Sequence, residues 1–228
     1  MRIHLSNLFV LTLASALGLC GCTAYVRYPQ TSRSYEIIPG RLSIAVAKFV
    51  DERGDRSSFG TVGLYDLKSG VGVDIGKALQ QEIASALQTF GYNVIMVETE
   101  GNDEQALRSL LGTNKADLIL GGSVRNLWAV TPDALMKSAE ISGRASVTFV
   151  VRGETGARQR EVNVTDNRPV DMIGLKHFKN NTALMFGGEH HPGFDALFQQ
   201  ALARLAVAIV EDDEVKRAFT GLRKRSQG

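Results

Sequence analysis

The chain has 228 residues, of which 44% are hydrophobic and 22% charged, and its 26 Lys and Arg nearly balance its 24 Asp and Glu. This length suits one domain with short additions, and the apolar content is enough for a buried core, which excludes a disordered chain. A phosphate-binding surface needs a clustered excess of cations, so the near-balance of charge argues against nucleic acid as a partner.

The first 21 residues have the pattern of a signal peptide. A single cation, Arg2, precedes a charge-free apolar run over residues 8–19, which is too short to span a bilayer as a stable helix. The residues Leu19, Cys20, Gly21 and Cys22 that follow resemble the bacterial lipobox. Cys20 fits the lipobox less well, because the bulky Leu19 would stand directly before the cleaved bond. We therefore predict that cleavage leaves Cys22 as the mature N-terminus.

Cys22 is then expected to carry a diacylglyceryl thioether and an N-acyl chain such as palmitate, and three acyl chains make a stable anchor. The alternative is an ordinary secretory signal in which the cysteines are incidental. Thr23 stands where an Asp would resemble an inner-membrane retention signal. The resemblance implies the outer membrane, with the periplasmic face as the expected side.

Residues 22–40 are polar, contain Pro29 and Pro39 and show no periodicity, so we predict a flexible tether whose residues 35–38 dock on the domain. Residues 42–50 form an apolar run typical of a strand covered on both faces. A charged loop over 51–56 and a glycine-rich loop over 57–72, with a short extended piece at 61–64, are predicted next.

Helices and strands then alternate. Asp74 is expected to cap a helix that ends at Gly91, and strand 92–98 follows. Asn102 and Gln105 have the spacing of a capping box for a short second helix. The remaining predicted elements are a strand over 117–130, a hairpin of 140–152 with 158–165, an irregular segment over 167–192 and an amphipathic helix over 194–209.

The predicted order is β-α-β-α-β-β-β-α, which implies a mixed sheet with helices packed on it, classed as α/β or α+β. We expect residues 41–212 to form one periplasmic domain and residues 213–228 to form a charged C-terminal helix or tail.

Several segments resemble a group of small envelope domains. They are the strand 44–50 running into Asp51-Glu52-Arg53, the helix end Phe90-Gly91-Tyr92-Asn93-Val94, the strand Ala116-Asp117-Leu118-Ile119-Leu120-Gly121-Gly122 and the turn Gly153-Glu154-Thr155-Gly156. Together these segments resemble the YajG-type lipoproteins and, more distantly, the N-terminal domain of TolB and the periplasmic domain of the curli exporter CsgG. The resemblance covers residues 42–212 by arrangement rather than by a sharp motif.

This resemblance implies a lipid-anchored envelope protein without catalytic activity, which acts as a scaffold or accessory subunit of a secretion, export or motor-type assembly. Protein partners or a homo-oligomer are expected, with no cofactor besides the covalent lipid on Cys22. The alternative is a periplasmic carrier of a small molecule or metal that uses the loops 51–72 and 167–192.

Two candidate sites carry a chemical hypothesis of their own. His177 with either His190 or His191 could form an open metal site if the intervening loop folds back, and the competing interpretation is a set of solvated histidines. The glycines 70, 72 and 76 approach a dinucleotide-binding fingerprint. A long loop separates them from the first strand, however, so we expect no nucleotide site.

The C-terminal segment combines an apolar stripe with basic residues, which are Phe219, Leu222, Arg223, Lys224 and Arg225. Acidic residues precede the basic ones, an order that complements a helix dipole. Two interpretations stay open: a terminal helix whose stripe packs on the domain, or a docking helix for a partner or for anionic envelope polymers.

Overall fold

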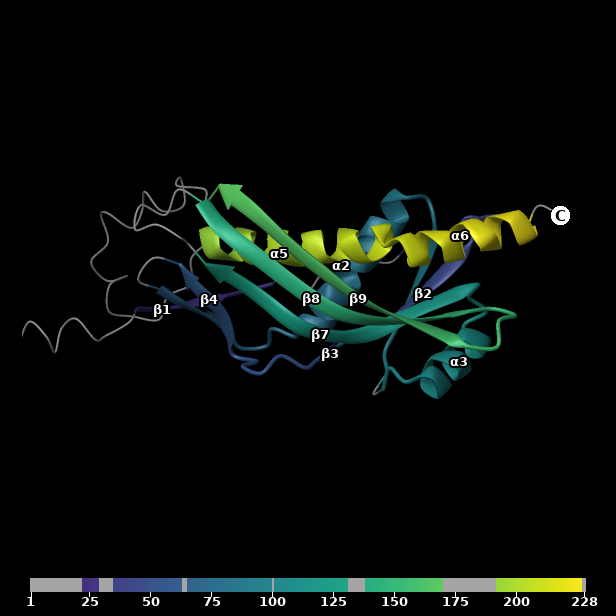
Figure 1. Ribbon diagram of the computed structural model, residues 1–228, viewed down its shortest axis with the longest axis horizontal. Helices are drawn as coiled ribbons and strands as arrows, with labels where there is room; N and C mark the ends of the chain where they lie inside the picture. Colours follow the sequence, from purple (N-terminus) through teal and green to yellow (C-terminus); the bar gives the residue numbers. More distant parts are fainter. Residues whose placement is uncertain are drawn as a thin grey trace, which may run out of the picture.

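The computed structural model describes residues 22–28, 35–62, 65–99, 101–130, 138–169 and 192–226. Within these ranges the chain forms one mixed nine-stranded sheet with helices packed on it, as predicted (Figure 1). The elements are β1 (Cys22–Val26), β2 (Ser43–Ala47), β3 (Val50–Asp51), β4 (Ser58–Val62), β5 (Tyr65–Ser69), α2 (Ile75–Thr89), β6 (Asn93–Val97), α3 (Glu104–Thr113), β7 (Leu118–Val130), β8 (Ser138–Val151), β9 (Ala157–Pro169), α5 (Pro192–Glu211) and α6 (Asp213–Ser226).

Strand β7 is the element that the rest of the sheet shares. Its beginning pairs in parallel with β2, its middle with β3 and its end with β4. The other edge of β7 pairs antiparallel with β8 over nearly its whole length, and β8 pairs with β9. Strand β6 extends the sheet beyond β2, and the strands β5 and β1 extend it beyond β4.

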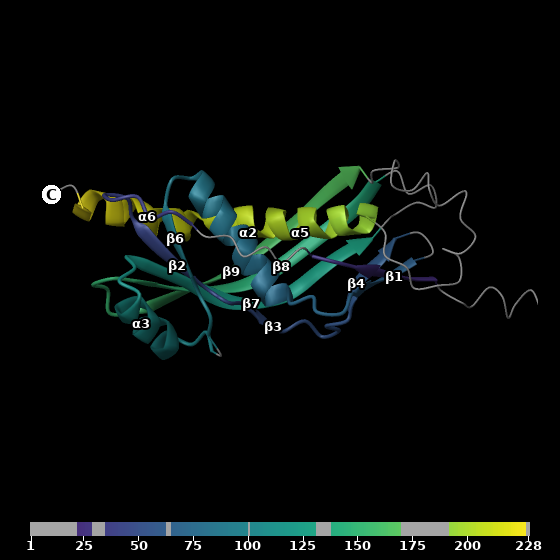
Figure 2. The ribbon, with the colours of Figure 1, turned by 180° about the vertical axis from the view of Figure 1, so that it is seen from behind.

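The two faces of the sheet are covered by different helices. Ile44 and Val46 of β2 belong to the large core that α2, α5 and α6 complete. Ala45 and Ala47 of the same strand belong to a smaller core formed with α3. All four side chains are fully buried, which confirms the prediction of a strand covered on both faces. Figure 2 shows α2 and α5 crossing the sheet while α3 lies apart from them.

Local signals set the ends of α2. The Asp74 side chain accepts a hydrogen bond from the backbone N–H of Lys77 at 3.0 Å, as an N-cap residue does. Gly91 follows the helix with a φ of +84°, a backbone conformation that favours glycine. In α3 the N-cap is Asp103, one residue later than predicted, because Asn102 donates its amide hydrogens to the carbonyls of Lys48 and Gly122 instead.

Two predictions about the first 72 residues are wrong in part. Residues 22–26 form the edge strand β1 instead of a free tether, and residues 35–38 do dock, because Asn93 bonds the backbone of Ile38 in both directions. The predicted loop over 57–72 contains strands β4 and β5, which pair antiparallel. Each of these two strands also has a partner distant in sequence, which is β7 for β4 and β1 for β5, and local patterns do not reveal such partners.

Helix α5 is long and apolar enough, by length and composition, to cross a membrane over Gly193–Glu211. Half of that window is buried inside the domain, and the helix contacts α2, β8, β9, β7 and β1. It therefore serves as the core helix of the domain. Helix α6 also packs into the same core, so the expected boundary between residues 212 and 213 separates two helices of one unit.

Gly60 is the residue at which β4 joins both neighbours, pairing with Leu67 of β5 and with Ala129 of β7. It has a φ of +113°, and a Cβ atom there would lie 1.9 Å from the carbonyl oxygen of Ala129. We expect Gly60→Ala to lower the free energy of unfolding by about 1–3 kcal/mol. Gly156→Ala is the control, because a Cβ atom there meets nothing within 4 Å. Equal stability of the two variants in urea titrations would contradict this account of the junction.

Candidate functional site at the anchor end of the sheet

Cys22, the predicted lipid-bearing residue, is the first residue of β1. This strand pairs in parallel with β5 from Cys22 opposite Tyr65 to Val26 opposite Ser69. Ala24 and Val26 face the core, where both are buried, whereas Tyr25 is 40% exposed on the other face. The predicted attachment point therefore belongs to a strand of the sheet.

The residues that follow β1 fasten it to three other elements. The carbonyl of Val26 accepts a hydrogen bond from Gly70 N, and Arg27 N donates to the Asp195 carboxylate of α5 at 2.7 Å. The Tyr28 hydroxyl donates to Glu82 of α2 at 2.8 Å. Contacts to the β5 end, α5 and α2 thus hold the chain within six residues of Cys22.

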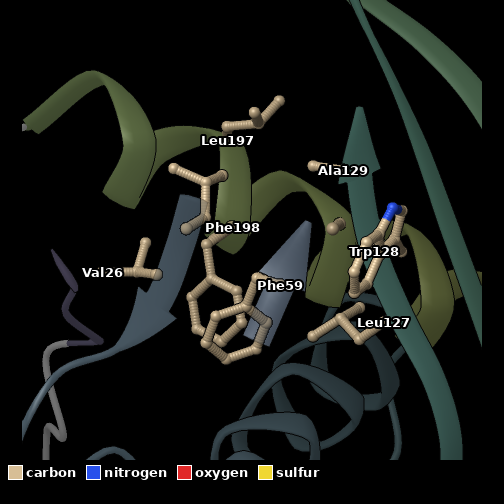
Figure 3. A pocket seen from close by; sticks show the side chains of 9 residues that line it. Val26, Phe59, Leu127, Trp128, Ala129, Leu197 and Phe198 are labelled. Atoms are coloured by element: carbon tan, nitrogen blue, oxygen red, sulfur yellow. The ribbon is translucent and has the colours of Figure 1, made fainter. Parts of the chain in front are cut away.

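An aromatic series connects this attachment to the interior. The rings of Tyr28 and Phe198 are perpendicular at a centroid distance of 6.3 Å, and the centroid of Phe198 lies 4.4 Å from that of Phe59 of β4. The guanidinium carbon of Arg53 lies 4.6 Å from the centroid of the Phe59 ring. We name these four residues the anchor cluster. Figure 3 shows the adjoining rings of Phe59 and Phe198 beside Val26.

Arg53 holds the turn between β3 and β4. It is 6% exposed and forms a bidentate pair with the Asp51 carboxylate at 2.9 and 3.0 Å. Its remaining donors reach the carbonyls of Ser58 and Arg56 at 2.8 and 2.7 Å. The buried Arg53 cation therefore fixes this part of the predicted loop 51–72. It does not form the open loop that the carrier hypothesis requires.

The hollow beside the anchor cluster is too small for a ligand. It is lined by apolar side chains of β1, β4, β5, β7 and α5 and measures about 10 Å³, roughly the space of one water molecule (Figure 3). An apolar hollow of that size is a packing gap.

The carboxyl end of β2, where dinucleotide-binding folds place a phosphate, is closed by an ion pair. The Lys48 ammonium lies 2.6 Å from the Asp74 carboxylate. Burial raises the pKa of Asp74, but the hydrogen bonds from Lys48 and from Lys77 N outweigh it and keep that pKa below its usual value. The hydrogen bond to Asp74 raises the pKa of Lys48. A Cβ atom at Gly76 would lie 1.7 Å from the carbonyl oxygen of Phe49, so this glycine serves the packing of helix on strand.

The other predicted site residues divide into two groups. His177, His190 and His191 lie outside the described residues, together with nearly all of the segment 167–192. Within the described part of the chain, no group of three or more His, Cys, Asp or Glu side chains is placed to hold a metal ion.

The residues of α6 favour the packing interpretation over the docking one. Phe219 and Leu222 are buried in the main core, so the apolar stripe is not available to a partner in this arrangement. Arg223 lies over the Tyr92 ring at 5.0 Å, and Arg225 pairs with Glu154 at 3.0 Å. Lys224 is exposed. The basic half of the predicted docking set thus remains on the surface.

Comparison with known proteins gives a loose likeness of fold. No family model matches the chain, and no curated protein matches it in sequence. Protein XCC0632 from Xanthomonas campestris is 14% identical, with a TM-score of 0.42 over 90% of this chain and 95% of that one. The PelC dodecamer from Paraburkholderia phytofirmans is 11% identical, with a TM-score of 0.40 over 78% and 93%.

Lipoprotein GNA1162 from Neisseria meningitidis is 15% identical, with a TM-score of 0.35 over 64% of this chain and 99% of that one. The similar structures therefore include bacterial lipoproteins. At TM-scores below 0.5 this likeness carries no inference about activity or partners.

The attachment of β1 can be tested by a buried charge. Val26→Asp places a carboxylate where the side chain is fully buried, and we expect it to detach β1 at a cost of about 1.5–3 kcal/mol from lost apolar burial alone. Hydrogen exchange should then be fast in residues 22–28 and remain slow in β7 and β8. Tyr25→Asp, on the exposed face of the same strand, should leave the exchange pattern unchanged. Slow exchange of β1 in Val26→Asp would show that the strand is held by something else.

The Arg53 pair can be compared with an exposed one. Arg53→Ala leaves Asp51 and two carbonyls without their donor, and we expect a loss of about 3 kcal/mol in the free energy of unfolding. Arg125 pairs with Glu52 at 2.7 Å nearby, but these side chains are 50% and 39% exposed. Arg125→Ala should therefore cost less than about 1 kcal/mol. Thermal or urea denaturation of both variants measures the difference. Similar losses in the free energy of unfolding would refute the conclusion that burial makes the Arg53 pair the stronger one.

Proposed function

We propose that the protein is an outer-membrane-anchored bacterial lipoprotein that acts as a non-catalytic scaffold or accessory subunit of a cell-envelope assembly. The observation that carries the proposal is the lipobox-like sequence Leu19-Cys20-Gly21-Cys22 after a charge-free apolar run. The fold supports it, because β1 begins at Cys22 and the lipid would be joined to a hydrogen-bonded sheet. Thr23 after Cys22 supports the outer membrane, with the domain on the periplasmic side.

A lipid attached in this way holds a rigid surface close to a membrane. The three acyl chains that a bacterial lipoprotein carries contribute about 0.8 kcal/mol for each buried methylene, so the anchor is stable where a single chain would be marginal. Residues 58–62 and 65–69, assigned to an open loop in the carrier hypothesis, instead form the antiparallel strands β4 and β5 of the sheet. The carrier hypothesis depends on the loops 51–72 and 167–192, and the first of these is largely a paired part of the sheet. This favours the scaffold.

The two cysteines provide a matched test of the anchor. Cys22→Ala should abolish acylation, so that the protein no longer fractionates with outer membranes and lacks the mass of the lipid. Cys20→Ala should leave both properties intact, because that residue is removed with the signal peptide. Mass spectrometry of the mature N-terminus and fractionation of both variants decide the matter. An acylated, membrane-bound Cys22→Ala protein would refute the proposal.

The scaffold role predicts a stable association that survives purification. Crosslinking in cells followed by mass spectrometry should recover either a second copy or a defined envelope partner, and size determination in detergent should give a mass above that of one chain. A protein that is monomeric in detergent and gives no crosslinks would be an anchored domain without the scaffold role.

A further inference from the structure

A second hollow lies far from the anchor, between the turn that joins α2 to β6 and the elbow of α5 with α6. Its volume is about 290 Å³, and its lining residues are Phe90, Tyr92, Val210, Lys216, Phe219, Thr220 and Arg223. We name it the elbow pocket. Its volume is close to the lower limit of about 300 Å³ for small-molecule sites and about twice that of a cavity that holds benzene. One ring or a short chain with a polar head would fill it.

The floor of the elbow pocket is apolar and aromatic. Val210 and Phe219 are buried, and the ring of Tyr92 lies 4.8 Å from that of Phe219 at an interplanar angle of 40°. Phe90 at the wall is 46% exposed. Burial raises the pKa of Tyr92 despite the opposing effect of Arg223, so its phenol is neutral at physiological pH.

The rim of the pocket is cationic. Lys216, Thr220 and Arg223 follow one another at helical spacing on α6, which places Thr220 between the two cationic residues on one side of the helix. None of the lining residues is acidic. Two nearby acids are directed elsewhere, since Asp212, which precedes α6, and Glu214 in its first turn face Arg160 of β9. Among the described residues, Lys216 has no ion-pair partner.

We propose that the elbow pocket binds a small organic anion with one apolar group, such as an aryl or short alkyl carboxylate. The apolar group packs on Tyr92, Phe219 and Val210, and the carboxylate receives charge-assisted hydrogen bonds from Lys216 and Arg223, which are stronger than bonds between neutral groups. This site is distinct from the loops of the carrier hypothesis, and it does not depend on the lipid anchor.

A fluorinated probe tests the ligand class. The mature lipidated protein in lipid nanodiscs is titrated with 3-(4-fluorophenyl)propionate and followed by ¹⁹F NMR, with empty nanodiscs as the blank. We expect saturable binding in the millimolar range, as befits so small a ligand. The matching amide, which has the same ring and no charge, should bind at least fivefold more weakly. Equal binding of the acid and the amide, or no binding above the blank, would overturn the proposal.

Variants of α6 locate the binding. Thr220→Trp fills the pocket and should abolish saturable binding, whereas Lys224→Trp adds the same ring to an exposed position outside the lining. Replacing Lys216 and Arg223 together by Gln should weaken binding at least tenfold, and the control replaces Arg217 and Lys224 in the same way. Circular dichroism checks that each variant is folded. Unchanged binding in folded Thr220→Trp, or an equal loss in the charge control, would refute the assignment.

Discussion

The whole sheet depends on the pairing of one long strand with three shorter ones in succession. Along one edge, the 13 residues of β7 pair with β2, then with β3 and then with β4, while β8 pairs with the other edge. The half of the sheet that contains β2 and β6 and the half that contains β4, β5 and β1 are therefore joined through the same strand. A bulge between Val124 and Asn126 interrupts the pairing with β8 midway, and such bulges increase the local twist. The two halves share one continuous backbone ladder, so a change in its register would displace both.

Helix α5 reinforces this arrangement because it runs along β7 and β8 and contacts elements of both halves. Its first turn holds the chain after β1 through Asp195, and its last turn supplies Val210 to the elbow pocket. The predicted anchor and the elbow pocket consequently lie at opposite ends of the domain, as Figure 1 shows for β1 and α6. At about 3.3 Å per residue, β7 alone separates them by roughly 40 Å.

Sequence patterns sufficed wherever a signal is local. Asp74 and Gly91 set the ends of α2, and alternation over residues 140–165 set the β8–β9 hairpin. They failed for β4, which pairs with the distant strand β7, and for β5 and β1, which pair with each other across a long stretch of sequence. Gly60 looked like a loop residue although its φ serves a strand junction. For α6 the sequence indicated the apolar stripe, but it did not indicate that the stripe packs into the main core. The elbow pocket combines residues 90–92, 210 and 216–223, and no pattern in the sequence links these three segments.

The pairing of β1 also changes what a lipid on Cys22 would do. A flexible coil of the 19 residues 22–40 would allow the domain to move about 25 Å from the membrane, by random-coil scaling. With Cys22 already part of the strand that pairs with β5, that slack would be absent, and only rotation about the lipid attachment would remain. The distance that the protein can reach from the membrane is then set by the length of its own sheet. A partner would have to lie within that distance of the membrane. The rigid pairing along β7 would then determine which surface of the domain the partner contacts at a given distance from the membrane.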